Sequence, residues 1–257
     1  DKFSIFQVYN SSNRIVMKLF STCFLLLTTT TTCAFQLLPQ LQLRVPTSLR
    51  VSSSTTGVES RIEECRSMLV TAAETKQEDP ELVVQALVDL EKLMREQCKI
   101  ESDTAQRVLD QLNGSWRLIF TTGTAESQKR LGARINYFPL KAVQSFDTST
   151  WNIENGIYIG DLPLIQFQGD FQFNLKSRKL EFDFTSLSML GFITIPLGNG
   201  QAAQLGASSG LGSQSNVANS ARNRKAFFNW ISADDTIATA RGGGGGLALW
   251  KRVVVSE

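Results

Sequence analysis

Residues 165–184 read IQFQGDFQFNLKSRKLEFDF, and this stretch decides the fold class. On both sides of its charged centre, apolar and aromatic side chains alternate with polar ones. A period of two is typical of a β-strand that has one dry face and one wet face. The centre at 176–179 contains only Lys, Ser and Arg, so the two runs are predicted to pair as an antiparallel hairpin.

The dry face of this hairpin carries five phenylalanines, Phe167, Phe171, Phe173, Phe182 and Phe184. Burying one Phe contributes about 1.5–3 kcal/mol, so an aromatic face is expected in any β core. The five rings are therefore first of all predicted core residues. Contact of some of them with a bound ligand is the alternative.

More strands are predicted on either side of the hairpin, at 116–122, 142–147, 150–159, 192–197, 226–231, 236–241 and 247–255. Together with the hairpin they give eight or nine antiparallel strands. Closure into a barrel is the simplest way to avoid exposed strand edges. The predicted fold class is mainly β, an antiparallel barrel over residues 114–257, with room inside for packed side chains or one small ligand.

Residues 59–113 have a helical period and are predicted to form two or three helices before the barrel. Asp79 is expected to cap the second helix, with Pro80 at its first position. Ser102 is expected to cap a third helix that ends at Asn113. The polar faces mix acids and bases, which favours helices packed on the barrel over helices lying on a membrane surface.

The chain contains no histidine, which excludes any His-dependent catalytic triad and removes the commonest metal ligand. The alternation places Asp170, Glu181 and Asp183 on the wet face, away from any cavity, so paired acid/base catalysis is not expected there. We predict no enzyme activity, no metal site and no cofactor. The four cysteines lack metal-ligand spacing and are expected to be small buried hydrophobes: Cys23, Cys33, Cys65 and Cys98.

The charges nearly balance, with 26 Lys and Arg against 24 Asp and Glu. Binding to nucleic acid requires a basic surface that neutralises phosphates, and the composition gives no reason to expect one. Nucleic acid is therefore not an expected partner.

The first 58 residues are predicted to be a targeting presequence, because no acidic residue occurs between Lys2 and Val58. Met17 and Lys18 precede a short apolar run that ends near Ala34, as in a signal peptide at about 17–34. Residues 35–58 are rich in Ser and Thr and lack acids, as in an organellar transit peptide. This series resembles the bipartite presequence of algae with a secondarily acquired red plastid. A secretory signal followed by a flexible linker is the alternative.

Both ends of the predicted barrel resemble the plastid lipid-associated protein (fibrillin) family. Residues 112–122, LNGSWRLIFTT, are similar to its opening strand, Leu-x-Gly-x-Trp-x-Leu-x-aromatic-Thr/Ser. Residues 234–252, DDTIATARGGGGGLALWKR, are similar to its closing segment. Residues 143–147 and 155–156 resemble its middle strands, and the likeness covers about residues 59–253.

The resemblance implies a lipocalin-like barrel in the plastid, at thylakoids or plastoglobules. It implies a non-catalytic protein that binds or organises carotenoids, quinones or membrane lipids, with the five phenylalanines as candidate ligand contacts. A coat of lipid bodies, or a protein that docks on a photosynthetic complex without an internal ligand, is the alternative. The expected partners are a hydrophobic small molecule or lipid and a plastid membrane or plastoglobule surface.

Three further expectations concern the ends of the barrel. The glycine run at 242–246 is predicted to be a wide hairpin turn, because a phosphate-binding loop would have to open a helix. Residues 198–224, rich in Gly, Ser, Ala and Asn, are predicted to form a mobile flap at one end. In lipocalin-like barrels an Arg of the closing strand typically covers the first-strand Trp, so Gly114, Trp116 and Arg241 are predicted to close the barrel.

Overall fold

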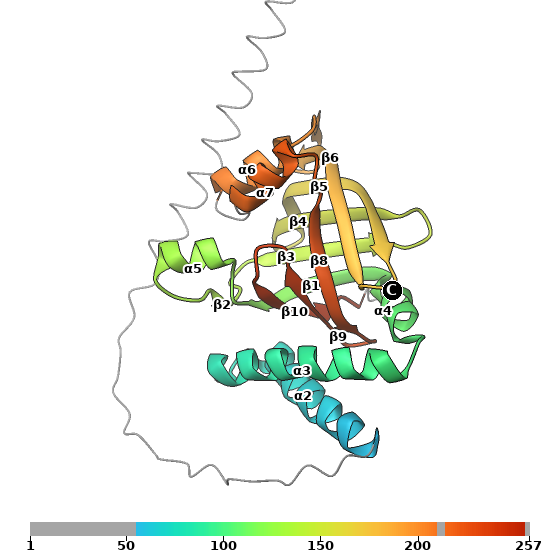
Figure 1. Ribbon diagram of the computed structural model, residues 1–257. Coiled ribbons are helices and arrows are strands. Elements are labelled where there is room, and N and C mark those ends of the chain that lie inside the picture. The colour runs from blue at the N-terminus through green and yellow to red at the C-terminus, as the bar shows by residue number, and fades with distance from the viewer. Residues whose placement is uncertain (1–54, 210–213, 255–257) are drawn as a thin grey trace, which may run out of the picture. The chain divides into compact units, whose positions relative to one another are not determined.

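The computed structural model describes residues 55–209 and 214–254 (Figure 1). The predicted presequence, 1–58 with its segments 17–34 and 35–58, lies outside the described residues except for its last four positions. At those positions α2 begins, at Thr55. The helices are α2 (Thr55–Thr75), α3 (Pro80–Ile100), α4 (Thr104–Leu112), α5 (Ala125–Leu131), α6 (Gln201–Ser209) and α7 (Gln214–Ala221).

The ten described strands form one antiparallel sheet. They are β1 (Gly114–Thr121), β2 (Asn136–Tyr137), β3 (Lys141–Asp147), β4 (Asn152–Ile159), β5 (Leu162–Asn174), β6 (Lys179–Met189), β7 (Ile193–Pro196), β8 (Ala226–Ala233), β9 (Ile237–Gly242) and β10 (Leu247–Arg252).

Eight of the strands close into a barrel in the order β1-β3-β4-β5-β6-β8-β9-β10. The pairing of β10 with β1, from Trp116 opposite Arg252 to Thr121 opposite Ala248, completes the ring. β2 and β7 are short strands that add to β1 and β6. The structure confirms the predicted class: mainly β, a lipocalin-like antiparallel barrel preceded by α-helices.

The hairpin predicted from residues 165–184 is β5 and β6, with Phe171 opposite Phe182 and Asn174 opposite Lys179. Both strands are longer than predicted. The ladder shifts register between Gln168 and Gly169, which keeps Phe184 and Leu187 on the same face of the sheet. Gly169 is required at this shift because an added Cβ would lie 1.9 Å from the carbonyl oxygen of Asp183.

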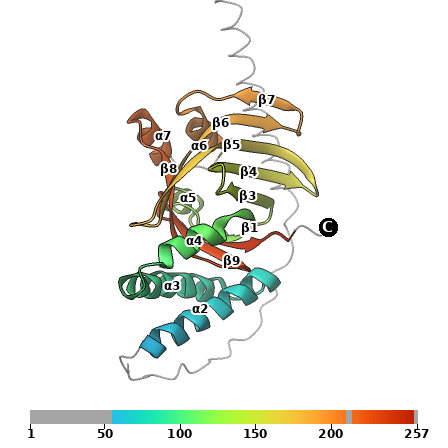
Figure 2. The same cartoon turned by 90° about the vertical axis from the view of Figure 1, so that its right-hand side faces the viewer.

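Two apolar cores lie on opposite sides of the barrel wall. The outer core packs α2 and α3 against outward-facing residues of β1, β8, β9 and β10, including Ile119, Ile237 and Leu249. The inner core fills part of the barrel and includes Trp230 and Trp250, with residues of α4 packed among them. Figure 2 shows α2 and α3 lying along the side of the barrel near β1 and β9. The helical preface thus packs on the barrel, as its mixed polar faces predicted.

We call the end of the barrel at α4 and the β3–β4 and β5–β6 turns the closed end. There Trp116 is fully buried, and its Nε1 donates to the carbonyl oxygen of Leu112 at 2.8 Å. Arg252 donates to the carbonyl oxygens of Gln111 and Asn113, at 2.5 and 2.9 Å. The last carbonyls of a helix lack partners within the helix, so Trp116 and Arg252 together satisfy the end of α4.

The predicted pairing of Trp116 with Arg241 is wrong, because Arg252 covers the indole. Its guanidinium carbon lies 4.1 Å from the centre of the Trp116 ring. The register places Arg252 directly opposite Trp116 on β10, whereas Arg241 lies on β9. Gly114 adopts a φ of +109°, and an added Cβ would lie 3.2 Å from the Arg252 guanidinium.

Arg241 instead joins the barrel to α3. Its Nε and Nη2 donate to the carboxylate of Glu91, at 2.5–3.1 Å, and its Nη1 donates to the carbonyl oxygen of Gly245 at 2.7 Å. Glu91 is 8% exposed and also accepts from Arg95 at 2.8 Å. The hydrogen bond from Arg241 lowers the pKa of Glu91, while burial opposes this shift.

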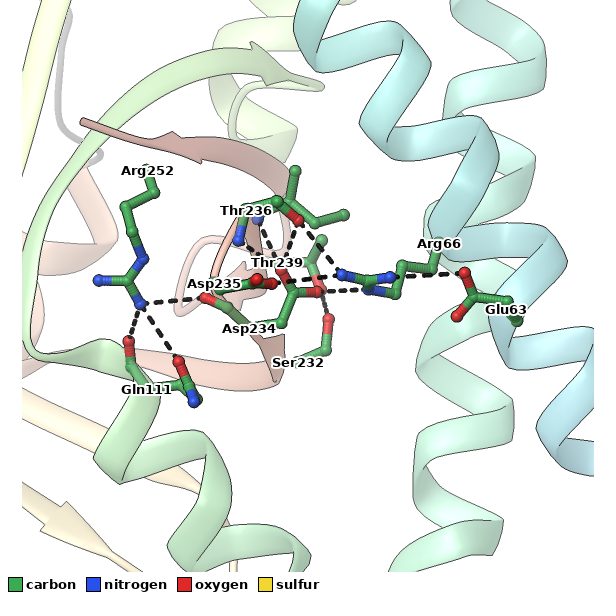
Figure 3. Close-up of polar contacts among 10 residues, drawn as sticks. Glu63, Arg66, Gln111, Ser232, Asp234, Asp235, Thr236, Thr239 and Arg252 are labelled. Carbon is green, nitrogen blue, oxygen red and sulfur yellow. Dashed lines mark hydrogen bonds and ion pairs between the residues drawn. The ribbon is translucent and has the colours of Figure 1, made fainter. Parts of the chain in front are cut away.

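A second polar cluster joins α2 to the β8–β9 turn (Figure 3). One carboxylate oxygen of Asp234 accepts from Arg66 Nε at 2.7 Å, and the other accepts from the backbone of Thr236 and Ile237. The carbonyl oxygen of Asp234 accepts from Arg252 at 3.0 Å. Burial alone would raise the pKa of Asp234, but the hydrogen bonds from Arg66, Thr236 and Ile237 lower it. The turn therefore links α2 to the closed end of the barrel.

The helix starts are confirmed in one case and corrected in the other. Asp79 caps α3 by accepting from the backbone of Glu81 at 2.7 Å, and Pro80 is the first helical residue. The predicted cap at Ser102 is wrong, because α4 begins at Thr104 after Asp103. Asp103 makes no capping bond, and its carboxylate accepts from Arg107 instead.

We predict that Trp116 and Arg252 are energetically coupled. In a double-mutant cycle with Trp116→Leu and Arg252→Gln, the coupling energy from urea unfolding should be about 0.5–2 kcal/mol. The matched control cycle with Trp116→Leu and Arg241→Gln should give a coupling near zero. No coupling between Trp116 and Arg252 would contradict this account of the closed end.

We predict that the Glu91–Arg241 contact makes the fold acid-sensitive. Because the pKa of Glu91 is lowered in the folded state, its stabilisation is complete above the unfolded-state pKa of about 4.3. It is lost as the pH falls through the folded-state pKa. Glu91→Gln should therefore reduce the unfolding free energy at pH 7 by about 1.5–3 kcal/mol, and the deficit should shrink below about pH 4.

The control for this experiment is Glu81→Gln, which breaks an ion pair with Arg134 on an exposed side chain. Exposed pairs contribute less than about 1 kcal/mol, so this variant should differ little from the wild type. Urea unfolding at pH 7 and pH 3.5 provides the measurement. A Glu91→Gln deficit that stays the same at both pH values would exclude the ionised carboxylate as its cause.

Candidate functional site

The candidate site is a cavity of about 480 Å³ inside the barrel. It lies toward the end opposite α4, which we call the open end. That end carries the β4–β5, β6–β7 and β9–β10 turns, since neighbouring antiparallel strands turn at alternate ends. The inner core lies between the cavity and the closed end and is packed. The barrel is therefore filled at its closed end and hollow near its open end.

The wall of the cavity is mainly apolar and aromatic. Phe182 stacks on Phe228, with ring centres 5.3 Å apart, and Phe228 lies nearly perpendicular to Trp250, with ring centres 5.8 Å apart. Ala142, Ile157 and Ile165 line the other side, in register on β3, β4 and β5. Ala248 of β10 also lines the cavity, two residues before Trp250. Like Ala142, it has a small side chain that leaves the cavity unfilled at its position.

The five predicted phenylalanines do not share one role. Phe167, Phe182 and Phe184 line the cavity, and the ring centre of Phe184 lies 5.4 Å from that of Phe167 and 5.2 Å from that of Phe182. Phe171 is 1% exposed and packs edge-on against Phe146 in the inner core. Phe173 also packs against that core and is absent from the cavity wall. The structure therefore brings three of the five together at the cavity.

Residues 198–224 contribute to the cavity at the open end, and their secondary structure was not predicted from the sequence. No helix was predicted for residues 198–224, yet α6 and α7 form there, and Ala202, Ala203 and Ser220 line the cavity. Figure 1 shows α6 and α7 beside the end of the barrel near β5 and β6. The residues between them, 210–213, lie outside the described part of the chain. The mobility predicted for this flap stays a prediction.

The glycine run forms the hairpin turn between β9 and β10, as predicted. Gly242 donates to the carbonyl oxygen of Gly246 at 2.8 Å, and Ala125 of α5 donates to that of Gly244 at 3.2 Å. An added Cβ at Gly246 would lie 2.3 Å from the carbonyl oxygen of Gly123. The run thus allows the turn to pack closely against the end of β1 and the start of α5.

Charged residues at the cavity are few. Asp183, Arg224 and Lys225 are the charged members of its lining, and both basic side chains are exposed. Asp183 contributes to the wall between Phe182 and Phe184, but its side chain alternates with theirs and lies opposite exposed Asp170, on the outer face that the alternation predicted. Asp170 and Glu181 do not line the cavity.

Sequence reasoning missed the polar residues inside the barrel. Gln144 and Asn155 line the cavity, directly opposite each other on β3 and β4. Gln144 is 3% exposed. The sequence contains a signal for this residue. In the predicted strand at 142–147, alternation puts Gln144 on the same face as the apolar Phe146. A polar residue on a predicted dry face marks such a position.

The described residues also bear on metal binding, cysteine chemistry and membrane-spanning helices. Across 55–209 and 214–254, no three His, Cys, Asp or Glu side chains cluster so as to hold a metal ion. Cys65 and Cys98 are unpaired and only partly buried, and burial raises the pKa of Cys65. Within the same residues, no helix has the length and apolar character needed to cross a membrane.

A closed eight-stranded barrel with an apolar internal cavity and a helical preface defines the class of lipocalin-like barrel proteins. The PAP_fibrillin family model matches residues 66–250, which include most of the preface and nearly all of the barrel. The chain therefore belongs to the plastid lipid-associated protein (fibrillin) family. No curated protein matches it with significant similarity. This family is associated with plastids and is generally non-catalytic.

Proposed function

We propose that this chain is a non-catalytic plastid protein that holds one hydrophobic small molecule inside its barrel. The observation that carries the proposal is the 480 Å³ cavity with a mainly apolar and aromatic wall. Binding pockets for small molecules usually measure about 300–1,000 Å³ and combine apolar walls with a few polar groups. An isoprenoid such as a carotenoid fragment or a quinone, or one membrane-lipid chain, suits such a space.

The ligand contacts in this proposal are Phe167, Phe182 and Phe184, whereas Phe171 and Phe173 support the wall from the inner core. The predicted presequence at 1–58 would deliver the chain to the plastid. Residues 59–113 would act as the helical preface and 114–257 as the barrel domain. Thylakoids or plastoglobules are the proposed places where it meets its ligand.

A lipid surface is the second proposed partner, and exposed apolar side chains at the open end favour it. The neighbouring β4–β5 and β6–β7 turns carry five large apolar residues that are 43–75% exposed: Ile159, Leu162, Leu190, Phe192 and Ile193. The backbone of Leu190 donates to the carbonyl oxygen of Leu164, which holds the two turns together. Contact of these turns with lipid would place the cavity next to the source of its ligand.

Co-purification tests the internal ligand. We predict that the protein purified from plastids carries a pigment, quinone or lipid that mass spectrometry of the extract identifies. Ala142→Phe, which fills the cavity from its wall, should lose this molecule. Gln172→Phe, on the exposed outer face of β5, should keep it. Protein that folds normally and carries no such molecule would favour the alternative, a lipid-body coat or a docking protein without an internal ligand.

Vesicle sedimentation tests the lipid surface. We predict that Phe192→Ser combined with Ile193→Ser lowers the fraction bound to uncharged lipid vesicles several-fold, because the variant removes exposed apolar area. The matched control is Trp151→Ser combined with Leu175→Ser, which removes exposed apolar residues from the β3–β4 and β5–β6 turns at the closed end. Equal loss of binding in both variants would contradict a specific role for the open end.

A further inference from the structure

Gln144 places an unused hydrogen-bond donor at the cavity. Its side chain is 3% exposed, and its Nε2 has no hydrogen-bond partner. The residue lies on β3 opposite Trp116 of β1 and Asn155 of β4, and directly opposed residues project to the same face. Trp116 belongs to the inner core and Asn155 lines the cavity, so the Gln144 side chain faces the interior.

A buried donor without a partner is unfavourable, and such a group calls for an explanation. Trp116 offers no acceptor, since its indole nitrogen is itself a donor and is already bonded to Leu112. Gln144 lies at the boundary between the packed inner core and the cavity. It is opposite Asn155 on β4, and Asn155 is in turn opposite Phe167 on β5. A bound molecule can therefore reach its amide from the open end.

The charges of the cavity decide the chemistry of that molecule. The charged residues of the lining, Asp183, Arg224 and Lys225, belong to β6 and to the segment before β8, and none lies on β3 or β4. An anionic group placed at Gln144 would be buried without a cation beside it, which is strongly unfavourable. The matching group is an uncharged oxygen acceptor.

We infer that the cavity selects a hydrophobic molecule that carries a neutral carbonyl or hydroxyl oxygen, and that this oxygen accepts a hydrogen bond from Gln144 Nε2. The molecule enters with its oxygen-bearing end first, and its hydrocarbon part lies against Phe167, Phe182 and Phe184. Oxygen-free hydrocarbons leave the donor unpaired and bind less tightly. This inference rests on the proposed function, because it specifies the ligand of the same cavity.

A matched pair of probes tests the inference. Farnesylacetone, an isoprenoid ketone, and the hydrocarbon of the same skeleton without the carbonyl are titrated into the full chain. Binding is followed by tryptophan fluorescence, since Trp250 lines the cavity. We expect the wild type to bind the ketone about fivefold more tightly than the hydrocarbon, the effect of one neutral hydrogen bond.

Gln144→Leu should remove this preference by weakening ketone binding alone, and should leave the ligand-free melting temperature unchanged or higher, because an unpaired donor is lost. Gln172→Leu makes the same change on the exposed outer face of β5 and should keep the preference. If the Leu variant fails to fold, Gln144→Met removes the donor while keeping the length of the side chain.

The possible failures are distinguishable. If the wild type binds both probes equally, or if Gln144→Leu keeps the preference for the ketone, the inference is overturned and the proposed function stands. If the wild type binds neither probe, the inference and the internal-ligand proposal both fail.

Discussion

The closed end of the barrel depends on how the last carbonyls of α4 are satisfied. Trp116 at the start of β1 and Arg252 at the end of β10 donate to these carbonyls, and the Arg252 guanidinium covers the indole. The same two strands must pair for the sheet to close. One arginine therefore fixes the helix, the first strand and the last strand relative to one another. Its bond to the carbonyl oxygen of Asp234 extends this arrangement to the turn that Arg66 of α2 contacts.

The barrel is packed at its closed end and covered by helices on one side, whereas it is hollow near its open end. The wall formed by β9 and β10 is buried on both faces, by α2 and α3 outside and by the inner core inside. Trp116, Trp230 and Phe171 fill the interior at the closed end, whereas alanines such as Ala142 and Ala248 leave space further along. The exposed apolar turns and the cavity both lie toward the open end of the barrel.

The alternation in residues 165–184 was sufficient to predict the hairpin, and similar patterns predicted most strands and the closed barrel. Contacts between residues distant in sequence were harder to predict. Arg241 and Arg252 both follow Trp116 by more than a hundred residues, and only the β1–β10 register decides which one covers the indole. Alternation places Phe171 and Phe184 on the same face of the sheet. It does not predict that Phe171 is buried in the inner core, whereas Phe184 lines the cavity.

The central claim is that a hydrophobic molecule binds inside the barrel rather than on its outer helices. Isotope-filtered nuclear Overhauser spectroscopy of the protein saturated with an isoprenoid ketone tests it most directly, because it reports which side chains touch the ligand. The account predicts contacts from ligand methyl groups to the rings of Phe167 and Phe184 and to the methyl groups of Ile157 and Ile165. Contacts confined to exposed side chains of α2 and α3, with none to those rings, would contradict it.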